Sequence, residues 1–129
     1  MNLIKKIDIK VKLSTLWIII MFNMVFADIL SLFIPWMLEE LIEFAGDTPI
    51  SHLMLIGAII HQIPIFMIFL SRILNYKTNR ILNITASIIT IIYVIWGGSL
   101  FPHYIFIATV EVILMLYIIK ISYSWREQD

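Results

Sequence analysis

The sequence predicts an all-α membrane protein, a transmembrane four-helix up-down-up-down bundle with a short interfacial amphipathic helix between the first two spans. Of its 129 residues, 61% are hydrophobic and only 14% are charged, whereas soluble domains are about 45–50% apolar and about 25% charged. The apolar residues form four runs long enough to cross a bilayer. Every Lys and Arg lies at or beyond the ends of these runs, on one predicted side.

The four spans are expected at about 13–34, 50–70, 79–96 and 102–120. The third run is short, so it is expected to include a turn from the polar stretch before it. The connections between the later spans are short, which makes consecutive helices antiparallel neighbours. We therefore expect residues 1–129 to form a single integral membrane domain.

The connection between the first two spans has its own pattern. Pro35 ends the first helix, and Trp36 follows as an interfacial anchor. Beyond them, an apolar helical face opposes three glutamates. That face consists of Leu38, Leu41, Ile42 and Ala45. The pattern predicts a short helix on the membrane surface.

Basic residues fix the expected orientation. They occur in the N-terminal segment, in the second loop and at the C-terminal end, and the other two loops contain none. They are Lys5, Lys6, Lys10, Lys12, Arg72, Lys77, Arg80, Lys120 and Arg126. By the positive-inside rule, both termini are cytoplasmic. We expect a multi-pass protein of a bacterial cytoplasmic (inner) membrane.

Three ionisable side chains fall inside the spans, namely Asp28, His61 and Glu111. Each costs roughly 2.5–3.5 kcal/mol on insertion scales, so such residues usually serve a function. At about 1.5 Å per helical residue, they lie roughly 10, 16 and 13 Å from the outer boundary. They come from three helices at similar depth, each on an inward-facing stripe. We therefore expect them to converge on one site that binds a ligand or a proton.

A polar stripe on the third span is expected to pack inward, and its Asn83 and Thr90 are assigned to the same site. His52, His103 and Tyr104 lie near outer helix ends and are assigned to an outer mouth. Tyr104 also fits an outer aromatic belt with Tyr93 and Trp96. The alternative for the three ionisable groups is a hydrogen-bonded network that only fixes helix register.

Several classes of chemistry are absent from the sequence. The chain has no Cys, which excludes disulfides, thiolate metal sites and iron–sulfur clusters. It has no His-x-x-Glu or Glu-x-x-His pair on one helix, so no metal site is assigned. It has no phosphate loop, nucleophile elbow or nucleic-acid signature. We expect no cofactor and no nucleic-acid partner.

Several stretches resemble a family of small bacterial four-helix integral membrane proteins classed as a domain of unknown function. They are Lys12-Leu-Ser-Thr-Leu-Trp17, Asn23-Met-Val-Phe-Ala-Asp-Ile-Leu-Ser31, Ile63-Pro-Ile65 with Ser71-Arg72, and Gly97-Gly-Ser-Leu-Phe-Pro-His-Tyr-Ile105 with Glu111. The resemblance covers nearly the whole chain. It implies the fold and the membrane location, but no activity.

Three functions remain open at this stage. The first is a module that binds or transports a proton, a cation or a small amphipathic ligand, as a homo-oligomer because four helices leave little room for a pathway. The second is an intramembrane enzyme with Asp28 or Glu111 as general acid and His61 as base, acting on a lipid-soluble substrate. The third is a membrane accessory or scaffold protein. The lipid bilayer is a partner in all three.

Overall fold

The protein was analysed as a computed structural model, in which residues 8–127 are described. Five helices follow one another without a strand in this range. They are α1 (Ile9–Ser31), α2 (Met37–Ala45), α3 (Ile50–Ile73), α4 (Tyr76–Trp96) and α5 (Pro102–Tyr123). The predicted all-α fold class, with a short helix between the first two spans, is confirmed.

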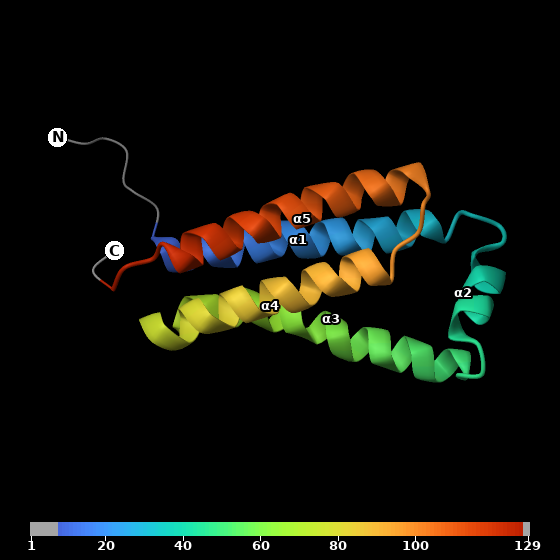
Figure 1. The fold of residues 1–129 in the computed structure, drawn as a ribbon, viewed down its shortest axis with the longest axis horizontal. Coiled ribbons are helices and arrows are strands. Elements are labelled where there is room, and N and C mark those ends of the chain that lie inside the picture. The colour runs from blue at the N-terminus through green and yellow to red at the C-terminus, as the bar shows by residue number, and fades with distance from the viewer. Residues whose placement is uncertain (1–7, 128–129) are drawn as a thin grey trace.

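The four long helices form an antiparallel bundle (Figure 1). α1 packs against α3 and α5, and α4 packs against the same two helices. Consecutive spans are therefore neighbours, whereas α1 and α4 face each other across the bundle. The start of α1 and the end of α5 lie at one end of the bundle, here called the terminal end. α2 crosses the opposite end, here called the α2 end.

The observed spans differ from the expected ones only near their ends. α1 stops at Ser31, three residues earlier than expected, because residues 32–34 form tight turns ahead of Pro35. Its other end extends to Ile9, where Asp8 caps the helix by accepting a bond from the Lys10 amide at 3.0 Å. α4 begins at Tyr76, which confirms the additional turn expected for the third span.

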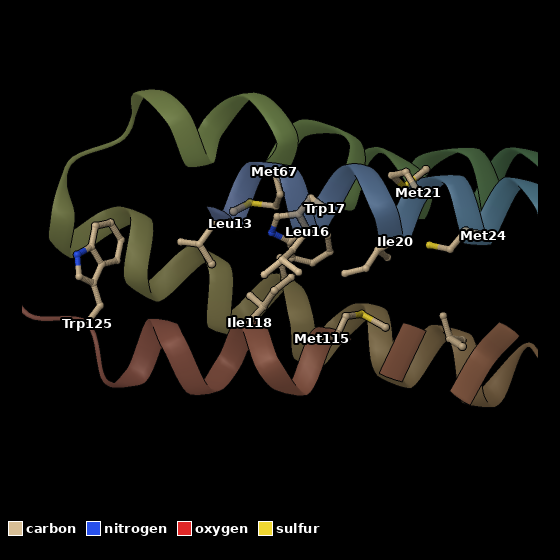
Figure 2. Close-up of a cluster of buried hydrophobic side chains, with 12 residues drawn as sticks. Leu13, Leu16, Trp17, Ile20, Met21, Met24, Met67, Met115, Ile118 and Trp125 are labelled. Atoms are coloured by element: carbon tan, nitrogen blue, oxygen red, sulfur yellow. The ribbon is translucent and has the colours of Figure 1, made fainter. Parts of the chain in front are cut away.

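The hydrophobic core is centred on α1 (Figure 2). The Trp17 side chain is fully buried, and Met67, Met115 and Ile118 reach the same core from α3 and α5. Other α1 side chains extend this core along the helix, from Leu13 through Leu16, Ile20 and Met21 to Met24. α1 is therefore the central helix of the bundle.

Large apolar side chains also cover the outside of every long helix. Phe22, Phe69, Ile92 and Phe106 are examples, one from each, and all are more than half exposed. All four long helices meet the length and hydropathy of a membrane span. Since such surfaces are stable against lipid and not against water, the protein is a multi-pass membrane protein.

α3 packs closely only in its C-terminal half. Its buried residues are Pro64, Met67 and Ser71, and none is buried from Ile50 to Ile63. Pro64 lacks the amide hydrogen that would bond to the preceding turn, which weakens the helix at that point. Figure 1 shows α3 diverging from the other helices towards the α2 end. The bundle is thus closed at the terminal end and open beside α3 at the α2 end.

α2 is attached loosely. None of its residues is buried, and its main packing is against α3. The Phe44 ring contacts Trp96 edge-on, with 6.2 Å between ring centroids. Two residues of the expected apolar face, Leu38 and Ile42, are 58% and 51% exposed. They point away from the bundle, as expected for a helix that lies against lipid.

Reporter fusions test the topology. Fusions placed after Asp47 and after Lys77 are expected to report opposite sides of the membrane, outside for the first and cytoplasmic for the second, because α3 crosses the bilayer between them. A reporter that is active only in the cytoplasm and one that is active only outside should give complementary signals. Finding both positions on the same side would contradict the four-span architecture.

Candidate functional site

The three ionisable residues of the spans line one small cavity. Asp28 reaches it from α1, His61 from α3 and Glu111 from α5. α4 completes the wall with Tyr93 and Val94. The cavity measures about 20 Å³, which is room for about one water molecule. Four helices therefore converge on a polar site that has space for one very small occupant.

Asp28 stands at the open side of the cavity. It continues the buried stripe that runs through Trp17, Met21 and Met24 on α1, so its side chain points inward. That side chain is nevertheless 67% exposed, because the facing half of α3 diverges from the bundle. Its Oδ2 atom lies 3.8 Å from His61 Nε2. This pair is the only salt-bridge contact found among residues 8–127.

The His61 ring has a defined orientation and tautomer. Its Nδ1 atom lies 2.7 Å from the backbone carbonyl oxygen of Gly57. A carbonyl oxygen can only accept a hydrogen bond, so Nδ1 carries the hydrogen. The Tyr93 ring packs edge-on against the imidazole, with 5.3 Å between centroids. Nε2 therefore faces Asp28 as the atom at which the ring gains or loses a proton.

Glu111 is the most deeply buried of the three, with 3% of its surface exposed. It makes no hydrogen bond or ion pair with any residue in the described range. The hydroxyls of Ser87 and Thr90 are buried and likewise have no partner there. The antiparallel packing of α4 and α5, marked by the Tyr104–Val94 hydrogen bond, brings these hydroxyls close to the level of Glu111. Buried polar groups rarely stay unbonded, so the Glu111 carboxyl group, which lines the cavity, can bond to one small polar occupant there.

Two tyrosines belong to this site instead of an aromatic belt. Tyr104 lines the cavity and donates a hydrogen bond of 2.8 Å to the Val94 carbonyl oxygen. Gly98 permits this packing, since a Cβ there would lie 2.5 Å from the Tyr104 ring. Tyr93 was not among the expected site residues. The signal that could have identified it is its spacing, one helical turn after Thr90 on the inward stripe of α4.

The residues assigned to an outer mouth separate into three environments. Tyr104 lines the cavity. His103 Nε2 lies 3.0 Å from Ser31 Oγ and its ring stacks on Phe101, so it joins the start of α5 to the end of α1. His52 is exposed on the first turn of α3 and does not line the cavity. These three residues therefore do not form one mouth.

Asn83 and Thr90 do not line the cavity either. Thr90 is one of the unbonded groups beside it, whereas Asn83 lies nearer the terminal end in a fully bonded network. Asn83 Oδ1 accepts bonds from Trp17 Nε1 at 2.7 Å and Ser71 Oγ at 3.3 Å. Its Nδ2 donates to both oxygens of Asn79. This network joins α1, α3 and α4, and its geometry is that of a structural element.

Metal binding finds no support in the described range. Across residues 8–127, no group of three or more His, Cys, Asp or Glu side chains is placed to hold a metal ion. A divalent metal in a protein normally needs three or more such ligands or backbone oxygens. The Asp28, His61 and Glu111 side chains that line the cavity can each donate or accept a proton.

The profile of a family of unknown function, DUF6326, matches residues 4–129. The chain belongs to this family. No curated protein and no solved structure matches it. Family membership agrees with the expected resemblance and carries no activity, so the function has to be argued from the site.

Replacing Asn83 by Leu tests the structural network. The change leaves the Trp17 indole N–H without a buried acceptor, which is expected to cost about 1–3 kcal/mol of stability. The midpoint of thermal unfolding in detergent should fall clearly. The control is Ile88→Leu on the same helix, at a position that is 47% exposed, and it should change little. Equal midpoints for the two variants would show that the network does not hold the bundle together.

Proposed function

We propose that the protein binds protons at the Asp28–His61–Glu111 site and transfers them through the membrane, as a small proton-dependent transport protein. The observation that carries the proposal is the convergence of three ionisable side chains from three helices on one cavity within the bundle. Ionisable groups at such depth are costly, and proton relays are one of their established uses.

The size of the cavity favours a proton over the other ligands considered. About 20 Å³ holds one water molecule or one hydrated proton. It leaves no room for a sterol-like lipid or a quinone, so the geometry offers no support for an intramembrane enzyme acting on such a substrate. It also leaves no room for an amphipathic molecule between Asp28 and Glu111.

The orientation of His61 supports proton exchange with Asp28. Because Nδ1 donates to the Gly57 carbonyl, a neutral ring presents its Nε2 lone pair to the carboxylate. A proton that arrives at the open side can reside on Asp28 Oδ2 or on His61 Nε2. The gap of 3.8 Å is longer than a hydrogen bond, so direct transfer needs a small approach of α3 or one bridging water.

A route towards the terminal end begins at Glu111. The unbonded Ser87 hydroxyl lies on the α4 stripe between Thr90 and the network residue Asn83, at about the level of this carboxyl group in the antiparallel packing of α4 and α5. Hydroxyls both donate and accept hydrogen bonds, so they can pass a proton along a chain that includes water. A purely structural core would be expected to satisfy these groups directly.

The proposal includes an orientation and an assembly. The α2 end faces away from the cytoplasm, because its connecting segments contain no Lys or Arg, and a bacterial inner membrane is the expected location. The working form is a homo-oligomer. A mid-membrane carboxylate that is two-thirds exposed cannot rest against hydrocarbon at low cost, and a second copy on the open side of α3 would cover it.

Proton flux into liposomes tests the function. Under an imposed membrane potential, the wild-type protein should acidify vesicles loaded with a pH-sensitive dye faster than protein-free vesicles do. Glu111→Gln and Asp28→Asn should fall to the protein-free rate, because each keeps the side-chain shape and removes the exchangeable proton. Asp47→Asn, an acidic residue in the α2–α3 connection, is the matched control and should keep the wild-type rate.

A second measurement separates proton binding from proton transfer. The imidazole NMR signals of His61 report the surroundings of its ring directly. Asp28→Asn and Glu111→Gln should both move these signals at a fixed pH, since the three groups share one site. Unchanged signals in both variants would overturn the shared site. A proton flux through the wild-type protein that equals the protein-free rate would contradict proton transfer, but it would not contradict proton binding.

Cross-linking tests the oligomer. The chain contains no cysteine, so a single introduced thiol gives an unambiguous product. Val25→Cys lies on α1 beside α3 and should form cross-linked dimers with a short bis-maleimide in membranes. The comparison variant is Phe106→Cys. Residue 106 is 71% exposed and lies on α5, which does not pack against α3. Equal cross-linking of both variants would contradict an interface on the open side.

A further inference from the structure

A second and much larger cavity lies at the α2 end, apart from the polar site. It measures about 580 Å³, is partly open, and is lined by α2, the first turns of α3 and the segment 97–101 between α4 and α5. Figure 1 shows α2 crossing this end of the bundle where α3 has diverged. Sites for small organic molecules commonly measure about 300–1,000 Å³. The cavity, here called the α2 cavity, therefore has the volume of a ligand site.

The wall of the α2 cavity is apolar and adaptable. Aromatic rings contribute from both sides, Phe44 from α2 and Phe101 from the α4–α5 connection. Met37 and Met54 add flexible thioether side chains, which fit irregular apolar shapes and accommodate different ligands. A ligand that fills this space must therefore present a bulky apolar body.

One charge faces this apolar space. Glu40 is the only charged residue that lines the α2 cavity, and it has no hydrogen bond or ion pair within residues 8–127. The connecting segments at this end, 32–49 and 97–101, contain no Lys or Arg that could neutralise it. Three further acidic residues lie in the same region, Glu39, Glu43 and Asp47. Glu40 is exposed and carries a charge that a cationic ligand in the cavity would complement.

The helical spacing of α2 selects Glu40 from its acidic neighbours. Met37, Glu40, Leu41 and Phe44 line the cavity, and they recur at intervals of three and four residues. This is the spacing of one helical face. Glu39 and Glu43 do not line the cavity. They contribute to the acidic surroundings and serve as matched controls for Glu40.

Tyr93 lies between the α2 cavity and the polar site. Its ring packs against His61. Its hydroxyl lies near Gly57, where an added Cβ atom would be 3.7 Å from the hydroxyl oxygen. Gly97, one turn further along α4, already lines the α2 cavity. Tyr104 also lines the polar cavity, and its ring lies against Gly98, which lines the α2 cavity. The two spaces are thus separate and adjacent, with two tyrosine side chains at their boundary.

We propose that the α2 cavity binds an amphipathic organic cation, with its apolar body against the Phe and Met side chains and its positive charge beside Glu40. This goes beyond proton binding and does not depend on it, since no residue lines both cavities. Charge complementarity with Glu40 favours a cation as the ligand. A cavity of about 580 Å³ is much larger than a simple inorganic ion, so an organic molecule is expected as the main occupant. An amine-headed lipid of the surrounding leaflet is the competing occupant.

Binding of tetraphenylphosphonium to the full chain in phosphatidylcholine nanodiscs tests the proposal. Tetraphenylborate has the same four phenyl rings around the opposite charge, so the pair separates charge from apolarity. After subtraction of empty discs, calorimetry should detect binding of the cation and not of the anion. Glu40→Gln should weaken cation binding by about fivefold, as expected for one partly screened ion pair. Glu39→Gln should leave it unchanged.

Further variants and lipids remove the alternatives. Leu53→Trp fills the cavity from α3 and should abolish binding, whereas Glu111→Gln should bind as the wild type does. A failure of the cation-binding proposal can therefore be distinguished from a failure of the proton-binding proposal. Equal affinity for both ions, or for wild type and Glu40→Gln, would overturn the proposal. Loss of binding in phosphatidylethanolamine discs would assign the cavity to the lipid amine and overturn it as well.

Discussion

The hydrogen bond from the Trp17 indole to the Asn83 side chain is the interaction on which the bundle depends most. It spans the core between α1 and α4, the two helices that face each other across the bundle. Asn83 is held in turn by Asn79 and Ser71, so one amide connects three helices. In a bilayer the apolar side chains gain little by leaving lipid for one another. Specific polar contacts of this kind therefore have to fix the helix register.

The position of this network divides the molecule into two halves. Towards the terminal end, α5 is tied to α4 through Arg80, which donates to the carbonyl oxygens of Ser122 and Tyr123. Towards the α2 end, α3 passes Pro64 and buries no residue beyond it. Rigidity is thus concentrated at one end, and the ionisable groups and both proposed binding spaces lie towards the other. This is the usual relation between a rigid scaffold and the site that it supports.

The open half gives the polar site its character. His61 lies one turn before Pro64, on the half of α3 that is held least, and its distance to Asp28 is just too long for a hydrogen bond. A small approach of α3 would close that contact. α3 contributes to the walls of both spaces, with His61 at the polar site and with Leu53 and Met54 at the α2 cavity.

The sequence by itself determined the membrane fold, its four spans and the helix between the first two. Apolar runs of span length and the stop at Pro35 suffice for that, because hydrophobic length and backbone restriction act locally. It also indicated a common level for Asp28, His61 and Glu111, since helical rise converts residue number into depth. The polar stripe of α4 was recognisable from spacing, and its residues from Asn79 to Thr90 are buried.

Only the tertiary structure decided which polar residues share a space. Asn83 and Thr90 lie on the same stripe, yet Asn83 belongs to the network with Trp17, whereas the buried Thr90 hydroxyl has no partner among the described residues. Tyr93 and Tyr104 line the polar cavity, although as interfacial aromatics they fitted a lipid-facing belt equally well. The divergence of α3 and the α2 cavity also left no mark in the sequence pattern. The physical reason is that periodicity fixes the face a residue occupies on its own helix, whereas its neighbours depend on how separate helices rotate and tilt against one another.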